Sequence, residues 1–206
     1  QRRGAYLPTV DVPALAPGLV GTALLEGTGE SLYRELQVSA RKTWPNASQL
    51  FLSYVRSSST GNTNDFGSLF TNLDAPLLEP GGQAPTSADV PHRFRGWATF
   101  SLPRQIVFSP SVEWRTGFAY SAQDIYRHFT GPLNGLRFPD YFSADVTTFK
   151  TFDILARKMD LGLQFFNITG HFNPRDVISV VGSPRYQEFT SSFGVTLTGY
   201  MQVRWP

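Results

Sequence analysis

The residue types that could do chemistry are densest in one stretch, "FNITGHFNPRDV", at positions 166–177. It holds the Asn-Xaa-Thr sequon of Asn167 and, close behind it, His171, Arg175 and Asp176. Such residues occur in sugar acceptors, catalytic triads and metal sites. However, a glycine and an Asn-Pro pair are typical of a turn, and no nearby residue completes a triad or a metal cluster. We therefore predict a rim loop whose polar groups make loop hydrogen bonds and caps.

The three histidines of the chain are the remaining candidates for ligand contact. His92, His128 and His171 all fall on or beside the ends of long loops, and neutral imidazole is a common ligand. Together with Arg175 they could contact a metal or a solute at a mouth formed by those loops. They lie on different loops with no ligand spacing between them, which favours three solvated, unrelated histidines. We predict no catalytic residue, no metal site and no cofactor, and an enzyme is the least favoured class.

The amino-acid composition further limits the kinds of partner, site and fold that are possible. The net charge is +2 with acids and bases mixed along the chain, which argues against nucleic acid as a partner. There is no cysteine, which excludes disulfides, thiolate zinc sites and cysteine nucleophiles. No apolar run approaches the length of a membrane-spanning helix. The 18 glycines and 15 prolines indicate many turns, so an all-β fold is the first expectation.

In the segments that would position these residues, apolar and polar residues alternate with a period of two. In Gln105–Ser121 the even positions are mostly apolar and the odd positions mostly polar, and residues 193–205 repeat the pattern with odd positions apolar. Successive side chains of a strand point to opposite faces, so each segment has one apolar face. Glu113 and Arg115 share the polar face, and we expect them to pair. We predict seven strands at residues 31–43, 49–59, 92–102, 105–120, 141–152, 157–168 and 188–205.

The connections between these strands alternate strictly between short and long. The long ones are residues 60–91, 121–140 and 169–187. In an antiparallel meander this sorts all long loops to one end and all turns to the other, as in outer-membrane barrels. Several strands also exceed the 5–6 residues usual in globular proteins and reach the length that crosses a bilayer. The expected fold is therefore all-β, an antiparallel meander forming part of a transmembrane outer-membrane β-barrel of about seven to eight long strands.

This interpretation predicts which side chains meet lipid. We expect two aromatic belts at headgroup level. The turn-side belt would comprise Trp44, Phe100, Phe152 and Trp205, and the loop-side belt Phe118, Tyr120, Tyr141 and Phe165. The lipid-facing residues would be Phe108, Val112, Trp114, Leu197, Met201 and Val203.

Six segments in order resemble the C-terminal barrel portion of TonB-dependent outer-membrane receptors, in particular the Oar-like group. They are "LYRELQVSARKTW", "LFLSYVRSSS", "DVPHRFRGWATFSLP", "DYFSADVTTFKTF", "LGLQFFNITGHFNPRDV" and "FGVTLTGYMQVRW". The resemblance runs from about Arg3 onward. It implies that residues 1–206 are one segment of a larger barrel of about 22 strands, without the plug and the energy-coupling segment.

The resemblance also implies function, place and partners. The implied function is TonB-dependent uptake of a scarce or bulky solute across the bacterial outer membrane. The implied partners are outer-membrane lipid, the TonB energy-coupling system and the barrel assembly machinery, which would read a C-terminal signal containing Val203 and Trp205. Two alternatives stay open. One is a small self-standing eight-stranded barrel with a structural or adhesion role, in which residues 3–12 pair with residues 193–203, and the other is a soluble all-β binding module.

Overall fold

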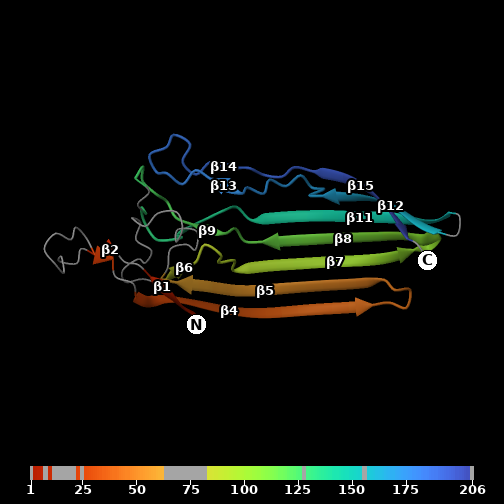
Figure 1. The fold of residues 1–206 in the computed structure, drawn as a ribbon, viewed down its shortest axis with the longest axis horizontal. Helices are drawn as coiled ribbons and strands as arrows, with labels where there is room; N and C mark the ends of the chain where they lie inside the picture. The colour runs from red at the N-terminus through yellow and green to blue at the C-terminus, as the bar shows by residue number, and fades with distance from the viewer. Residues whose placement is uncertain are drawn as a thin grey trace.

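The chain folds into one large antiparallel sheet with small accessory sheets in its loops (Figure 1). The computed structural model describes the backbone of residues 2–6, 9–10, 22–23, 26–62, 83–126, 129–154 and 157–204, and side chains from residue 30 onward within these ranges. No helix in the described part of the chain is long and apolar enough to span a membrane.

The large sheet is a meander in which each long strand pairs with the next. Its order is β1-β4-β5-β7-β8-β11-β12-β15, and β6 adds a short pairing to β5. The accessory sheets pair β2 with β3, β9 with β10, and β13 with β14. The long strands are β4 (Glu26–Thr43), β5 (Gln49–Gly61), β7 (His92–Leu102), β8 (Ile106–Arg115), β11 (Tyr141–Ile154), β12 (Arg157–Phe166) and β15 (Thr196–Arg204). The short ones are β1 (Arg2–Tyr6), β2 (Thr9–Val10), β3 (Thr22–Ala23), β6 (Ala84–Pro85), β9 (Ala119–Tyr120), β10 (Leu136–Arg137), β13 (Asp176–Val177) and β14 (Phe189–Thr190).

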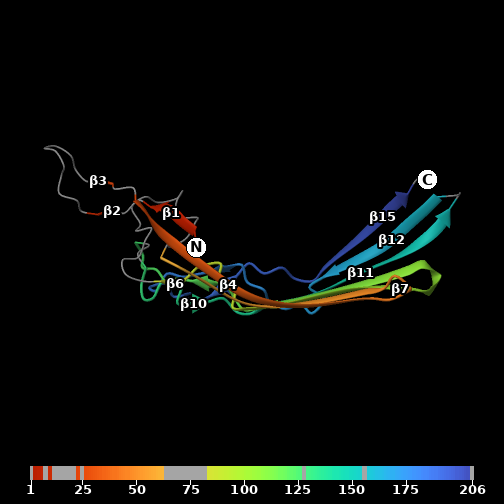
Figure 2. The same cartoon turned by 90° about the horizontal axis from the view of Figure 1, so that it is seen from below.

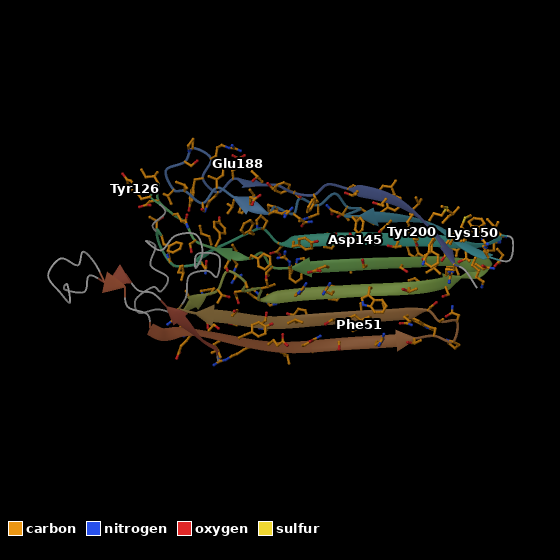
Figure 3. All side chains as sticks on the ribbon, viewed as in Figure 1. Phe51, Tyr126, Asp145, Lys150, Glu188 and Tyr200 are labelled. Carbon is orange, nitrogen blue, oxygen red and sulfur yellow. The ribbon has the colours of Figure 1, made fainter. Side chains whose placement is uncertain are left out.

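All seven predicted strands are present, and their connections are sorted as the loop lengths predict. The turns after β4 and β7 and the last residue of β11 lie at one end, and the described long loops lie at the other (Figure 1). In Figure 3, Tyr126 and Glu188 mark the loop end and Lys150 the turn end. The all-β antiparallel meander is therefore confirmed. The last strand is shorter than predicted, because residues 191–195 run outside the sheet before β15 begins.

The strand predicted over 105–120 was also too long, and Gly117 explains where it ends. The chain passes so close to the Phe138 backbone that a Cβ on Gly117 would lie 1.8 Å from the Phe138 carbonyl oxygen. Only glycine allows that approach, so β8 stops at Arg115 and the chain turns into the loop layer. The prediction missed this because alternation of apolar residues continues through Phe118 and Tyr120 although the strand does not.

Cross-strand register gives the sheet two chemically different faces. Odd-numbered residues of β4, β5, β7, β8 and β11 share one face with even-numbered residues of β12 and β15. This polar face carries mainly Ser, Thr, Gln, Asp, Glu and Arg. The opposite, apolar face is mainly aliphatic and aromatic. It carries all six residues predicted to face lipid: Phe108, Val112, Trp114, Leu197, Met201 and Val203.

An aromatic row closes the apolar face on its loop side, but its members differ from those predicted. Tyr54, Phe94, Trp114 and Phe142 are direct partners across β5, β7, β8 and β11. The predicted loop-side belt is wrong in three places: Tyr141 lies on the polar face, Tyr120 packs among the loops, and Phe118 follows the end of β8. Trp205 lies outside the described residues. The error arises because nearness to a strand end does not say which face a side chain occupies.

The sheet is bent, staggered and open. Figure 2 shows β15 at one edge and β4 near the other rising on the same side of the bend. The turn ends of the three hairpins are also staggered. Their last residue pairs are Thr43–Gln49, Leu102–Ile106 and Ile154–Arg157. The last pair shifts along the strands by three residues from the first hairpin to the second, and by four residues from the second to the third. Among the described residues, β15 pairs only with β12 and β1 only with β4. The ladder between residues 3–12 and 193–203 that the small-barrel alternative requires is not formed there.

The described residues form no core layer against either face of the sheet. The buried apolar residues are Ala98, Ala119, Ala122 and Leu133, and no large side chain is fully buried in the described part of the chain. Three of these four lie among the loops, which also contain the packed rings of Tyr120, Phe138 and Phe189, with centroids 5.2–6.2 Å apart. The close packing of this molecule is thus concentrated at the loop end.

Candidate functional site

A cluster of three arginines around one glutamate lies on the polar face near the loop end. Arg93 and Arg95 alternate on β7, and Glu113 and Arg115 alternate on β8, so all four point to one side. Glu113 accepts from the Nε of Arg93 at 3.0 Å and lies 3.3 Å from the Nε of Arg95. The Nε of Arg115 is 3.9 Å away, beyond hydrogen-bond distance. The pairing predicted between Glu113 and Arg115 is therefore the weakest of the three contacts.

Arg115 lies against rings instead of against a carboxylate. The guanidinium carbon is 4.1 Å from the ring centroid of Phe118 and 4.6 Å from that of Tyr141. These distances are typical of cation–π contacts. The Arg115 side chain is only 18% exposed. No described residue accepts a hydrogen bond from its guanidinium, so a largely buried cation keeps unused donors.

The same residues line a hollow of about 330 Å³ at the loop end. Arg175 lines it from the loop after β12, and its guanidinium carbon lies 4.9 Å from the ring of Phe193. The hollow therefore combines two arginines with aromatic and proline surfaces. Its lining is Arg115, Gly117, Phe118, Phe138, Pro139, Tyr141, Asn173, Pro174 and Arg175.

A second hollow of about 520 Å³ continues along the polar face. It is lined from Gln37 of β4 to Asp145 of β11, across five adjacent strands. Side chains of five strands converge only on the inside of a bend, so the polar face is the concave one. Arg93, Arg95 and Tyr141 line this hollow, and Tyr141 also lines the first. The two hollows thus form one polar surface that leads from the loops down the sheet.

The loops that frame this surface are tied to one another by buried polar groups. Asp89, in the loop after β5, forms a salt bridge with Arg137 of β10 and accepts a hydrogen bond from the Ser59 amide. Arg137 also donates to the Gly117 carbonyl at 3.1 Å. Because the Asp89 side chain is only 6% exposed, the pair is shielded from solvent on the acid's side. The first hollow, which Gly117 lines, therefore has a wall that is tied to the neighbouring loop.

Asn173 holds the remaining loop to the start of β11. Its side chain accepts from the Phe142 amide at 3.0 Å and donates to the Phe142 carbonyl at 2.8 Å. Asn167 is tied in a similar way, donating to the carbonyls of His171 and Phe193 at 3.0 Å. The stretch 166–177 is thus a loop whose polar groups cap and tie the backbone, as the sequence predicts.

The predicted contact residues do not gather at one mouth. His92 lies on the apolar face, where its Nδ1 is 2.7 Å from the Tyr54 hydroxyl and its ring centroid is 6.5 Å from that of Trp114. The Nδ1 of His171 is 3.1 Å from Asn173 Oδ1. Arg175 alone lines a hollow of the polar face, and His128 lies outside the described residues. Within those residues no group of three or more His, Asp or Glu is placed to hold a metal ion.

Sequence reasoning missed the arginines of the cluster as a site. The available signal was the alternation in "RFR" at 93–95 and "EWR" at 113–115, which puts charged side chains on one face of two strands. Alternation alone does not pair those strands, however, and it does not place the Phe118 and Tyr141 rings against Arg115. Comparison of this chain with family models, curated proteins and solved structures found no match.

Proposed function

We propose that this chain forms part of the wall of an outer-membrane β-barrel, belonging to a TonB-dependent receptor of the Oar-like group that takes up a solute. In this proposal the apolar face meets lipid and the concave polar face lines the solute path. The edge strands β1 and β15 pair with strands outside the described sheet, since an unpaired edge is not tolerated in lipid. The receptor class and the energy-coupling partner come from the sequence resemblance.

The observation that carries the proposal is the exposed apolar band on the convex face. A soluble sheet buries its apolar face under a second layer, but here that face has no such layer among the described residues. Large apolar side chains of this band are open to the surroundings on both sides of the sheet's midline. They include Leu36 (65% exposed), Val38 (61%), Leu163 (45%), Leu197 (57%) and Met201 (66%).

The height of the band agrees with a bilayer. On β11 it runs from Phe142 to Phe152, about 33 Å along the strand at about 3.3 Å per residue. The stagger of the hairpins, about seven residues over four strands spaced about 4.8 Å apart, corresponds to a strand tilt of roughly 45°. At that tilt the band is about 23 Å thick, close to the roughly 25 Å of outer-membrane barrels.

The ends of the band carry the side chains that membrane interfaces favour. Beyond the aromatic row, the next residues of the same face are Arg56 of β5 and His92 of β7. At the turn end, the Nζ of Lys150 lies 4.9 Å from the ring centroid of Phe152. A lysine there can extend its ammonium toward the headgroups while its stem covers apolar surface.

The decisive experiment uses two tryptophans on opposite faces. Trp97 lies on the polar face and Trp114 on the apolar face, three strand positions apart across neighbouring strands. The full chain is folded from urea into phosphatidylcholine vesicles in two variants, each retaining one of these tryptophans with the other three replaced by phenylalanine. Lipids brominated on their acyl chains should quench Trp114 strongly and Trp97 weakly.

Two outcomes would contradict the proposal. Equal quenching of both tryptophans would show that the two faces are not separated by lipid. No quenching of either, together with a monodisperse protein that unfolds cooperatively without detergent, would support the soluble binding module instead.

A further inference from the structure

We propose that the hollow between Arg115 and Arg175 binds an organic anion, namely a carboxylate attached to a flat apolar body. This inference deepens the proposed function, on which it rests, because it names the class of solute that the concave face would receive. The binding step itself can be tested apart from transport.

The cluster around Glu113 has more positive than negative charge. Glu113 is the only carboxylate in contact with Arg93, Arg95 and Arg115 among the described residues, so the cluster carries an excess of two positive charges. Arg175 adds a further cation at the rim, with a ring and no carboxylate as its described contact. Of these arginines Arg115 is largely buried, and a buried charge that is not matched is unfavourable unless an anion can neutralise it. The site therefore carries a net positive charge in the absence of a ligand, which favours the binding of an anion.

The guanidinium of Arg115 has hydrogen-bond donors that no described residue uses. Its side chain is 18% exposed and its nearest carboxylate oxygen lies 3.9 Å away. A guanidinium has five donors in a planar fork that matches the two oxygens of a carboxylate. The rings of Phe118 and Tyr141 hold this fork in place, which lowers the conformational entropy that binding would cost.

The apolar lining of the hollow specifies the rest of the ligand. Phe118, Phe138, Pro139 and Pro174 share the hollow with the two arginines. An inorganic anion would use the arginines alone and leave these surfaces in water. A carboxylate on a flat apolar body would use both, and about 330 Å³ accommodates a ring with its substituents.

The position of the hollow gives the bound anion an onward route. Arg115 is the direct partner of Arg93 on one side and of Tyr141 on the other, and Arg95 lies two residues further along β7. Both arginines of β7 line the larger hollow. An anion leaving Arg115 would thus meet positive charge on its way down the concave face.

The test uses benzene-1,3,5-tricarboxylate as the probe and the full chain in a zwitterionic detergent. Isothermal titration calorimetry should detect binding of this probe and none of its neutral analogue, benzene-1,3,5-tricarboxamide. Inorganic phosphate should bind at least about tenfold more weakly than the tricarboxylate, because it lacks the apolar body. Arg115→Gln and Arg175→Gln should each weaken tricarboxylate binding by about tenfold or more.

Two further variants keep the result interpretable. Arg41→Gln removes the same charge from an exposed position of β4 on the same face, away from the hollow, and should change affinity less than about twofold. Arg115→Lys keeps the charge but loses the planar fork, so its affinity should fall below that of the unchanged protein. Arg175 is exposed, so its substitution leaves the fold intact and tests the site even if Arg115 variants fold poorly.

The inference is overturned if the tricarboxamide or phosphate binds as tightly as the tricarboxylate. It is also overturned if Arg41→Gln weakens binding as much as Arg175→Gln, because the attraction would then be general and not local. Failure of the brominated-lipid experiment with intact anion binding would remove the membrane proposal and leave this site. The reverse result would remove this site and leave the membrane proposal.

Discussion

Replacing Val146 by arginine places a charge near the middle of the proposed lipid band. Val146 pairs with Pro110 on β8 and with Phe165 on β12, on the apolar face. It lies four residues from Phe142, which is about 13 Å along the strand and about 9 Å in depth at a tilt of roughly 45°. In a band about 23 Å thick this is within about 3 Å of the midplane. An arginine there should cost about 2–4 kcal/mol of folding free energy in lipid.

The neighbouring residue provides the matched control. Thr147 occupies the opposite face, where its partners are Ser109 and Gln164. Thr147→Arg should therefore change the free energy by less than about 0.5 kcal/mol, the usual range for surface substitutions. Both values would come from urea titrations of the chain in phosphatidylcholine vesicles, followed by tryptophan fluorescence. A cost at Thr147 equal to that at Val146 would refute the assignment of faces.

The cost of an arginine on the apolar face should also depend on its depth in the proposed lipid band. Val112 lies on the apolar face two residues from Trp114, which places it only about 5 Å deeper in the band than the aromatic row at the same strand tilt. Because the penalty for a cation falls toward the interfaces, Val112→Arg should cost about 1–2 kcal/mol, less than Val146→Arg. The opposite order would show that the aromatic row does not mark a membrane boundary.

Three further predictions concern the loop end. Arg137→Met leaves the buried carboxylate of Asp89 unpaired, and should lower loop stability by about 2–3 kcal/mol, measured by hydrogen exchange. Gly117→Ala forces a methyl group against the Phe138 carbonyl, and should destabilise the loops by about 3 kcal/mol in the same assay. Burial, with a smaller contribution from Tyr186, raises the pKa of Tyr120 above its ordinary value near 10. The buried, neutral Tyr120 therefore contributes fully to the stability of the loops below about pH 10. This stabilisation is lost as pH rises through the raised pKa, and near-UV circular dichroism should follow the loss.

Each of these predictions has a control at the same end of the sheet. Arg185→Met breaks an exposed ion pair with Glu188 and should have little effect, so an effect equal to that of Arg137→Met would contradict the burial argument. Gly194→Ala adds a methyl group where nothing lies within 4 Å and should be tolerated. Tyr120→Phe should abolish the alkaline transition, and a transition that persists in this variant would assign it to another group.

The strands and the two faces of the sheet were predictable from the order of residue types alone. Alternation with a period of two predicted all seven long strands, and for β7 it gave the observed limits, His92 and Leu102. It also predicted that Phe108, Val112 and Met201 share a face, because parity is a property of each strand and antiparallel pairing transfers it to the next. Loop lengths predicted the sorting of loops and turns for the same reason, since a meander reverses direction at every connection.

The contacts at the loop end arise from the packing of segments that are distant in sequence. Arg115 is set apart from the other arginines by the rings of Phe118 and Tyr141, which come from different segments and meet it only after β8 and β11 pair. Gly117 ends β8 because of the Phe138 backbone, 21 residues further along the chain. Periodicity describes one strand at a time, whereas these features depend on contacts between segments distant in sequence. The periodicity of the sequence therefore does not predict them.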